Sequence, residues 1–256
     1  MGHKTIELRI EGDIATLRLN RPEVMNALNS TMRYEIADAV QNLPETLRCL
    51  ILTGQGRAFC SGQDLGDAQV PVDLGKVLRD EYEPMVRAIR KARVPVIDAV
   101  NGVAAGAGAS LALAADVVIA AHSAVFVQAF TRIGLMPDAG GTFTLPRLIG
   151  HARAMGAMLF AEPIPATQAA SWGMIWEAVP DDGFEAHVAA RARMLARGPT
   201  AAFLAIRQAL VASAGKDFQA QLEVEAALQG QLGESRDFYE GVAAFLEKRS
   251  PQFTGA

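Results

Sequence analysis

The sequence has little cysteine and no strong excess of either charge. Its 256 residues include two cysteines, Cys49 and Cys60, so no disulfide scaffold is predicted. Because no secretory leader begins the chain, we expect a protein of the reducing cytoplasm. The net charge of −4 lacks the basic excess that is typical of nucleic-acid-binding proteins. We therefore expect no nucleic-acid partner.

A long uninterrupted apolar run is also missing. The longest stretch of small apolar residues covers 103–121, and Gly106, Gly108, Ser110 and Asp116 interrupt it. A membrane-spanning helix needs about 20 consecutive, predominantly apolar residues. The sequence therefore predicts no membrane span.

Patterns that indicate several kinds of chemistry are absent as well. The glycines at 102–108 lack the three-glycine spacing of a dinucleotide loop, and the acidic residue expected after the next strand is missing. No Gly-x-Ser-x-Gly elbow offers a hydrolase nucleophile. The four histidines, at 3, 122, 151 and 187, have no metal-ligand spacing. We expect no nicotinamide or other cofactor and no metal.

Among the patterns that the sequence does contain, the clearest are two glycine-rich loops at the ends of buried strands. The apolar strand 95–100 runs into Asn101–Asp116, where Gly106, Ala107 and Gly108 precede a helix of small residues. The start of a helix leaves N–H groups unpaired, and these suit a developing negative charge. The second loop is 57–65. Two converging N–H groups would stabilise an enolate or a tetrahedral oxyanion, although for each loop taken alone a tight turn is the better explanation of its glycines.

The remaining pattern predicts an α/β fold with an all-helical end. Residues 1–195 alternate strands and helices, whereas 196–256 are helical, with wide apolar faces that favour subunit packing. Ser30 is expected to cap the first helix. Strands are expected at 5–10, 14–19, 48–53, 95–100, 116–120, 124–127 and 175–179, and helices at 32–43, 76–92, 151–160, 166–172, 184–197, 199–213 and 217–249, the last broken near 230–233.

Several segments in order resemble signatures of one family. They are Ala58–Leu65, Asn101–Leu111 with Asp116, Gly134–Thr142 with Leu145–Arg147, Ala169–Ile175 and Glu240–Arg249. Together they resemble the crotonase (enoyl-CoA hydratase/isomerase) superfamily. The resemblance implies a spiral of ββα units with a helical C-terminal trimerisation region. It also implies an acyl-CoA thioester substrate, of which coenzyme A is a part, and a homotrimer or a hexamer built from two trimers.

The resemblance also implies site residues. The N–H groups of Ser61 and Ala107 would hold the thioester oxygen, so that the α-proton becomes removable. Basic residues would pair with phosphates of the coenzyme. The substrate-binding positions expected on this basis are Arg21, Ala27, Ala58, Gln63, Asp64, Leu65, Gly106, Gly108, Phe130, Phe245 and Lys248.

The sequence departs from the hydratases of the family at both catalytic glutamates. Ser110 and Phe130 stand at the two positions. Hydration needs a base for water and an acid for the α-carbon. Efficient hydratase activity is therefore not expected.

One carboxylate remains near the expected pocket, Asp138, in the segment Met136–Gly141. A single carboxylate can take a proton from one carbon and return it to another. An apolar wall of Phe126, Phe130, Ile133 and Leu135 would raise its pKa and make it a better base, although each of these residues is equally explained as core. The alternative for Asp138 is a helix N-cap.

Three hypotheses follow for the function. The segments 127–130, 134–142 and 172–176 are particularly similar to isomerases of the family that convert a ring-epoxidised phenylacetyl thioester or shift an enoyl double bond. The alternatives are a hydratase with an atypical acid or base and a non-catalytic acyl-CoA-binding homologue. We expect 66–80, which has no clear pattern, to shape the acyl pocket.

Overall fold

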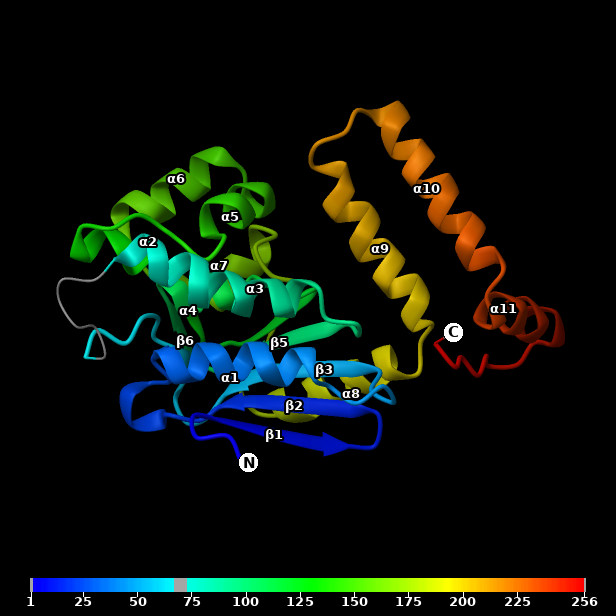
Figure 1. The fold of residues 1–256 in the computed structure, drawn as a ribbon, viewed down its shortest axis with the longest axis horizontal. Coiled ribbons are helices and arrows are strands. Elements are labelled where there is room, and N and C mark those ends of the chain that lie inside the picture. Colours follow the sequence, from blue (N-terminus) through cyan, green and yellow to red (C-terminus); the bar gives the residue numbers. More distant parts are fainter. Residues whose placement is uncertain (1, 67–72, 256) are drawn as a thin grey trace.

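Two sheets form the centre of the molecule (Figure 1). The computed structural model describes residues 2–66 and 73–255. The six-stranded sheet has the order β1-β2-β3-β5-β7-β10, and the four-stranded sheet has the order β4-β6-β8-β9. The β1–β2 and β8–β9 pairs are antiparallel, and the other pairs are parallel. The strands are β1 (Ile6–Glu11), β2 (Ile14–Leu19), β3 (Cys49–Gly54), β4 (Ala58–Cys60), β5 (Val96–Val100), β6 (Val103–Ala105), β7 (Val117–Ala121), β8 (Val125–Val127), β9 (Ile164–Pro165) and β10 (Glu177–Val179).

Helices cover the sheets and form the C-terminal end. The short 3-10 segments are η1 (Pro22–Val24) and η3 (Ala129–Ile133), and η2 (Leu78–Tyr82) is a π-helix. The α-helices are α1 (Ser30–Gln41), α2 (Leu74–Val77), α3 (Glu83–Arg90), α4 (Ala107–Ala112), α5 (Gly141–Ile149), α6 (His151–Phe160), α7 (Ala166–Ser171), α8 (Phe184–Ala196), α9 (Thr200–Ser213), α10 (Phe218–Gly233) and α11 (Arg236–Glu247).

The strands follow a repeating pattern that confirms the predicted ββα spiral. β3 and β4, then β5 and β6, then β7 and β8 each place one strand in the large sheet and the next in the small sheet. A helical segment follows each pair before the chain returns to the large sheet. The turns after β4 and β6 therefore come to the same end of the small sheet, because these two strands are parallel neighbours.

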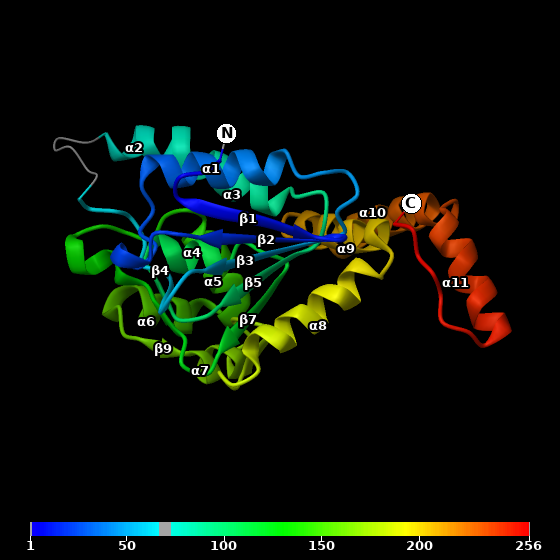
Figure 2. The same ribbon diagram turned by 90° about the horizontal axis from the view of Figure 1, so that it is seen from below.

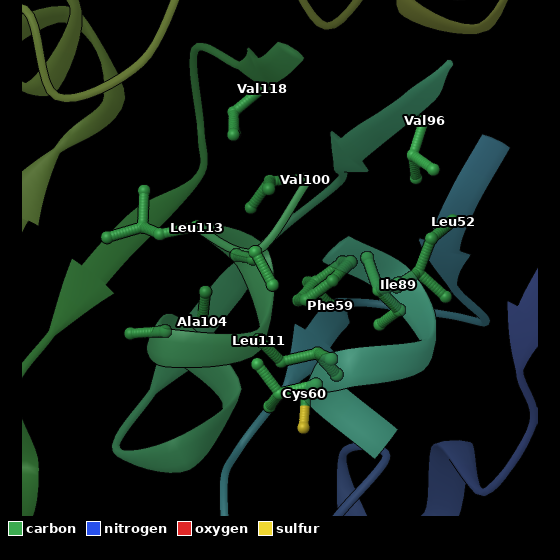
Figure 3. Packing of buried hydrophobic residues seen from close by; sticks show 14 of the residues in the cluster. Leu52, Phe59, Cys60, Ile89, Val96, Val100, Ala104, Leu111, Leu113 and Val118 are labelled. Atoms are coloured by element: carbon green, nitrogen blue, oxygen red, sulfur yellow. The ribbon is translucent and has the colours of Figure 1, made fainter. Parts of the chain in front are cut away.

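Alternation along the central strands divides the apolar core between two faces of the large sheet. Leu50, Leu52, Val96 and Val100 belong to the main core. Figure 3 shows part of it, with Phe59 and Cys60 of β4 gathered near Leu111 of α4. The intervening residues, such as Ile97, pack with α8 in a second cluster. In Figure 2, α8 crosses one side of the sheet, while α1 and α3 lie on the other. Both faces are covered, as buried parallel strands require.

The structure corrects three local predictions. The N-cap of α1 is Asn29 rather than Ser30, because the Asn29 side chain accepts the Met32 N–H at 2.8 Å. The predicted helix 76–92 is divided into α2, η2 and α3. The loops that were expected to lack strands contain β4 and β6, each only three residues long. Of the 66–80 segment, residues 67–72 lie outside the described part of the chain.

Beyond α8 the chain leaves the core as a helical arm of α9, α10 and α11 (Figure 1). The predicted break near 230–233 corresponds to the end of α10 at Gly233. Arg48 links the segment before α9 to the C-terminal residues, because it donates to the carbonyl oxygens of Gly198 at 2.6 Å and Thr254 at 2.5 Å. Within the described ranges, no helix is both long and apolar enough to cross a membrane.

Candidate active site

A cavity of about 1120 Å³ lies between the two glycine-rich loops and the segment that leads into α5. Ser61, Gln63 and Leu65 of the first loop line it, and so do Gly106 and Ala107 of the second. The third side is formed by apolar residues around Asp138, among them Phe130, Ile133, Leu135 and Met136. The structure thus brings the predicted donors and the predicted carboxylate to one cavity.

The first loop offers a donor other than the one predicted. The Ser61 N–H donates to the Met25 carbonyl oxygen at 3.0 Å, so Ser61 lines the cavity but its N–H is engaged. The Gly62 N–H faces the sulfur of Cys60. The Gln63 N–H has no acceptor among the described residues. Since Gln63 pairs with Leu28 as an isolated parallel bridge, its N–H points away from Leu28.

The second loop places Ala107 at the start of α4. Gly106 has φ +53° and ψ −128°, a conformation that glycine tolerates, and this turns the chain from β6 into the helix. The Gly106 N–H donates to the Val127 carbonyl oxygen at 2.8 Å. As the first helical residue, Ala107 has an N–H for which the helix supplies no acceptor, and no other described residue accepts it.

The two loops are held in close contact. A Cβ built on Gly62 lies 3.4 Å from the Ala107 nitrogen and 2.7 Å from the Ala105 oxygen. A Cβ on Gly108 lies 2.3 Å from the Cys60 oxygen. Gly108, predicted as a substrate-binding residue, does not line the cavity and instead permits α4 to pack against β4.

Asp138 lies in a strained turn before α5. Ala139 and Gly140 have φ values of +49° and +86°, and they reverse the chain beside the cavity. The N-cap of α5 is Gly140, with no side-chain cap, so the alternative role of Asp138 as a capping side chain is not observed. Its Oδ1 is buried and has no hydrogen-bond partner within the described part of the chain.

Burial raises the pKa of Asp138 to about 6, and the positive charge of Arg33 partly opposes this rise. A carboxyl group with this pKa exchanges protons readily near neutral pH. Its surroundings therefore suit a base that must also return a proton.

The positions of the two missing glutamates lie beside this centre. Ser110 is 4% exposed, its Oγ has no partner among the described residues, and it does not line the cavity. Phe130 is 6% exposed and lines the cavity as predicted. Neither side chain is a carboxylate that could replace the absent acid and base.

Four residues that were predicted to bind the coenzyme, Arg21, Ala27, Ala58 and Asp64, instead make contacts within the protein. Arg21 Nη1 pairs with Asp64 Oδ2 at 2.8 Å and donates to the Ala27 carbonyl oxygen at 2.6 Å. Ala58 is 1% exposed, and its carbonyl oxygen accepts from Asn26 at 2.9 Å. None of these four predicted residues lines the cavity, whereas Leu65 lines it and is 62% exposed.

Phe245 and Lys248 are not brought to the cavity of their own chain. Phe245, on α11, is 82% exposed, and Lys248 is the C-cap of that helix. The structure therefore leaves both on the helical arm (Figure 1).

Sequence reasoning missed Arg33 and Tyr82, which line the cavity. Arg33 is 2% exposed and Tyr82 is 3% exposed. Tyr82 occupies an apolar position of a helical pattern and so resembles a core residue, and Arg33 resembles a solvated helix residue. No local signal distinguishes these two residues from ordinary core and surface residues.

The described ranges 2–66 and 73–255 contain no candidate metal site, because no group of three or more His, Cys, Asp or Glu side chains there could hold an ion.

Fold and site together define a member of a known enzyme family. The chain belongs to the enoyl-CoA hydratase/isomerase family, whose sequence profile matches residues 9–256. It is 60% identical, over the full length of both chains, to a probable enoyl-CoA hydratase of Rhodobacter capsulatus. It is 48% identical to the 1,2-epoxyphenylacetyl-CoA isomerase of Escherichia coli, covering 96% of this chain and 97% of the other. The crystal structure of an enoyl-CoA hydratase from Bacillus anthracis has a TM-score of 0.91 at 30% identity, covering 99% of this chain and all of that one.

Proposed function

We propose that this protein is an acyl-CoA isomerase in which Asp138 moves the proton and the N–H groups of Gln63 and Ala107 hold the thioester oxygen. The observation that carries the proposal is that Asp138, whose Oδ1 is buried without a hydrogen-bond partner among the described residues, lines the same cavity as two N–H groups that have no acceptor in the described structure. Donors that are already in place stabilise an enolate without reorganisation.

The proposed cycle needs one carboxylate. Ionised Asp138 removes a proton from a carbon of the acyl chain, and the resulting dienolate places its negative charge on the oxygen between Gln63 and Ala107. Asp138, now protonated, returns the proton to a different carbon. The double bond thereby shifts, and no atom is gained or lost. Since Asp138 must start as a base, kcat/KM, which reports the ionisation of the free enzyme, is expected to rise as the pH increases through about 6.

The proposed substrate is an acyl-CoA thioester with a bulky acyl group, either a ring-epoxidised phenylacetyl group or an enoyl chain. The large cavity with apolar walls and the 48% identical isomerase support this choice. The thioester would be held by the N–H groups and by the loop that contains Leu65. We also propose that the exposed Phe245 and Lys248 contact the coenzyme bound to a neighbouring copy in a homotrimer or hexamer.

Hydration is the second candidate, because the 60% identical relative is described as a probable hydratase. Water addition across the double bond requires one group to activate water and another to protonate carbon. Ser110 and Phe130 provide neither at the usual positions. In hydration, Asp138 would therefore have to activate water and also protonate carbon. Isomerisation needs only one carboxylate, so the site favours it.

Replacing Asp138 by asparagine tests the proposal. Asp138→Asn is expected to bind acyl-CoA normally but to lose about 10²–10⁴-fold in kcat, the usual contribution of a positioned acid or base. Asp182→Asn, which changes an exposed carboxylate, is the matched control. Isomerisation and solvent-deuterium exchange at the α and γ carbons are measured with a 3-enoyl-CoA and with ring-epoxidised phenylacetyl-CoA.

The same assays separate the alternatives. Loss of enoyl absorbance with a 2-enoyl-CoA and formation of a hydroxyacyl product would indicate a hydratase. Tight binding without any deuterium exchange would indicate a non-catalytic protein. Near-normal turnover by Asp138→Asn would remove Asp138 from the mechanism.

A further inference from the structure

A buried polar cluster on the cavity wall contains side chains that neither transfer the proton nor hold the thioester oxygen in the cycle proposed above. It contains Arg33 of α1, Gln63 of the first loop and Tyr82 at the end of η2, and all three residues line the cavity. Arg33 and Tyr82 are almost completely buried. A buried network whose members satisfy one another is rigid and fixes a single arrangement.

Arg33 is the centre of the cluster. Its Nη1 donates to Gln63 Oε1 at 2.9 Å and to the Leu28 carbonyl oxygen at 2.6 Å. Leu28 is the residue that pairs with Gln63 in the isolated bridge, so Arg33 contacts both sides of this bridge. Glu81 Oε2 accepts from Arg33 Nε at 3.0 Å and from Nη2 at 2.6 Å. Two donors on one carboxylate fix the plane of the guanidinium group.

Tyr82 holds Gln63 from the other side. Its hydroxyl donates to Gln63 Oε1, and the Arg33 guanidinium carbon lies 4.7 Å from the centre of its ring. Burial raises the pKa of Tyr82, so the hydroxyl keeps its proton and remains a donor. The π-helix Leu78–Tyr82 precedes α3, and π-helical turns within helices often occur at functional sites.

These contacts immobilise Gln63 at both its side chain and its backbone. Oε1 accepts from Arg33 and Tyr82, and Nε2 donates to the Asp64 carbonyl oxygen at 3.2 Å. The neighbouring Gly62 oxygen and Asp64 nitrogen are bonded to Leu28 at 2.7 and 3.1 Å. Both polar atoms of the Gln63 side chain are thus engaged, whereas the described residues supply no acceptor for its backbone N–H.

We propose that Tyr82 and Arg33 are positioning residues that hold the Gln63 side chain and thereby fix the direction of the Gln63 N–H toward the thioester oxygen. This inference rests on the oxyanion hole proposed above. It gives η2, which ends at Tyr82, an influence through Gln63 on the stabilisation of negative charge in the reaction.

Removing the Tyr82 hydroxyl tests the inference with little change in packing. Tyr82→Phe is expected to lower kcat about ten-fold while KM changes less than about two-fold, because a misdirected donor weakens the transition state more than the bound ground state. Tyr34→Phe is the matched control, since Tyr34 is on α1 and is 70% exposed. Circular dichroism and thermal unfolding verify that each variant is folded.

A double-mutant cycle provides the second measurement. Gln63→Met keeps the length of the side chain but removes its hydrogen bonds to Tyr82, Arg33 and Asp64, so it is expected to lower kcat at least as much as Tyr82→Phe. Because both changes remove the same hydrogen bond, the double variant should lose no more than the larger single loss. Losses in kcat that multiply in the double variant would overturn the role of the Tyr82–Gln63 contact.

A spectroscopic measurement separates this inference from the role of Asp138. The probe is a 3-ketoacyl-CoA, which loses its acidic α-proton to solvent and becomes an enolate that absorbs ultraviolet light. Donors that hold the enolate oxygen favour this form. In an Asp138→Asn background, Tyr82→Phe should bind less of the enolate form, whereas Tyr34→Phe should not differ from its parent. Unchanged enolate absorbance in Tyr82→Phe refutes the positioning role, and active Asp138→Asn refutes the proton-transfer role independently.

Discussion

At the scale of single residues, Asp98 is the least expected feature of the core. It lies in the middle of β5, between Val96 and Val100, and its partners on the adjacent strands are Leu52 and Val118. These four neighbours belong to the main apolar core. Asp98 is fully buried, and neither carboxyl oxygen has a hydrogen-bond partner in the described part of the chain. Burial raises the pKa of Asp98 far above its ordinary value, and the negative charge of Asp116 adds to this effect.

We predict that Asp98→Val stabilises the protein, because it removes a buried polar group that lacks a partner. At pH 7 the free energy of unfolding should increase by about 1–3 kcal/mol. The folded wild type retains a proton that the unfolded chain releases above about pH 4. Its stability therefore falls as the pH rises from there toward the folded-state pKa, and this component should be absent in Asp98→Val.

Urea denaturation at several pH values measures the effect, with the exposed Asp182→Val as the control. Equal pH dependence of the unfolding free energy in wild type and Asp98→Val would contradict the prediction.

At the scale of elements, the site depends on the close approach of α4 to β4. Gly108 leaves room for this contact, since an added Cβ would lie 2.3 Å from the Cys60 oxygen and 2.8 Å from its sulfur. The backbone oxygen cannot move without shifting β4, which leads into the loop of Gln63. The packing of these two elements therefore sets the separation of the two proposed donors.

We expect Gly108→Ala to reduce the free energy of unfolding by about 1–3 kcal/mol, the usual cost of overpacking, and to lower kcat as well. Gly156→Ala, in α6, is the matched control because its added Cβ meets only Phe160 at 4.0 Å. There, alanine should stabilise the helix slightly. Urea denaturation and turnover of both variants give the comparison, and equal behaviour would show that the contact between α4 and β4 tolerates a methyl group.

At the scale of the whole molecule, the helical arm has more exposed apolar surface than a single chain would favour. Ile206, Leu210 and Val211 of α9 are 56%, 68% and 58% exposed, and Phe245 and Leu246 of α11 are 82% and 74% exposed. Large exposed apolar areas indicate an interaction surface. The arm also carries Phe245 and Lys248 away from the cavity of their own chain, which fits the proposed contribution to a neighbouring copy.

We predict that light scattering during size-exclusion chromatography gives the mass of a homotrimer or hexamer. Leu210→Asp should shift the mass toward the monomer, because a charge buried in an apolar interface is strongly unfavourable. Tyr34→Asp, an equally exposed position on α1, should leave the mass unchanged. A monomeric wild-type protein would contradict the assembly.

Sequence alone determined the family, the order of most elements, the two glycine-rich loops and the candidate Asp138, because each of these is a local pattern. Tertiary structure decided which N–H groups remain available. The Ser61 N–H is engaged by Met25, far away in sequence, and this leaves the Gln63 N–H as the proposed donor. Tertiary structure also gathered Arg33 and Tyr82 around Gln63. A hydrogen bond between distant segments depends on how the sheets and helices pack, and no local pattern carries that information.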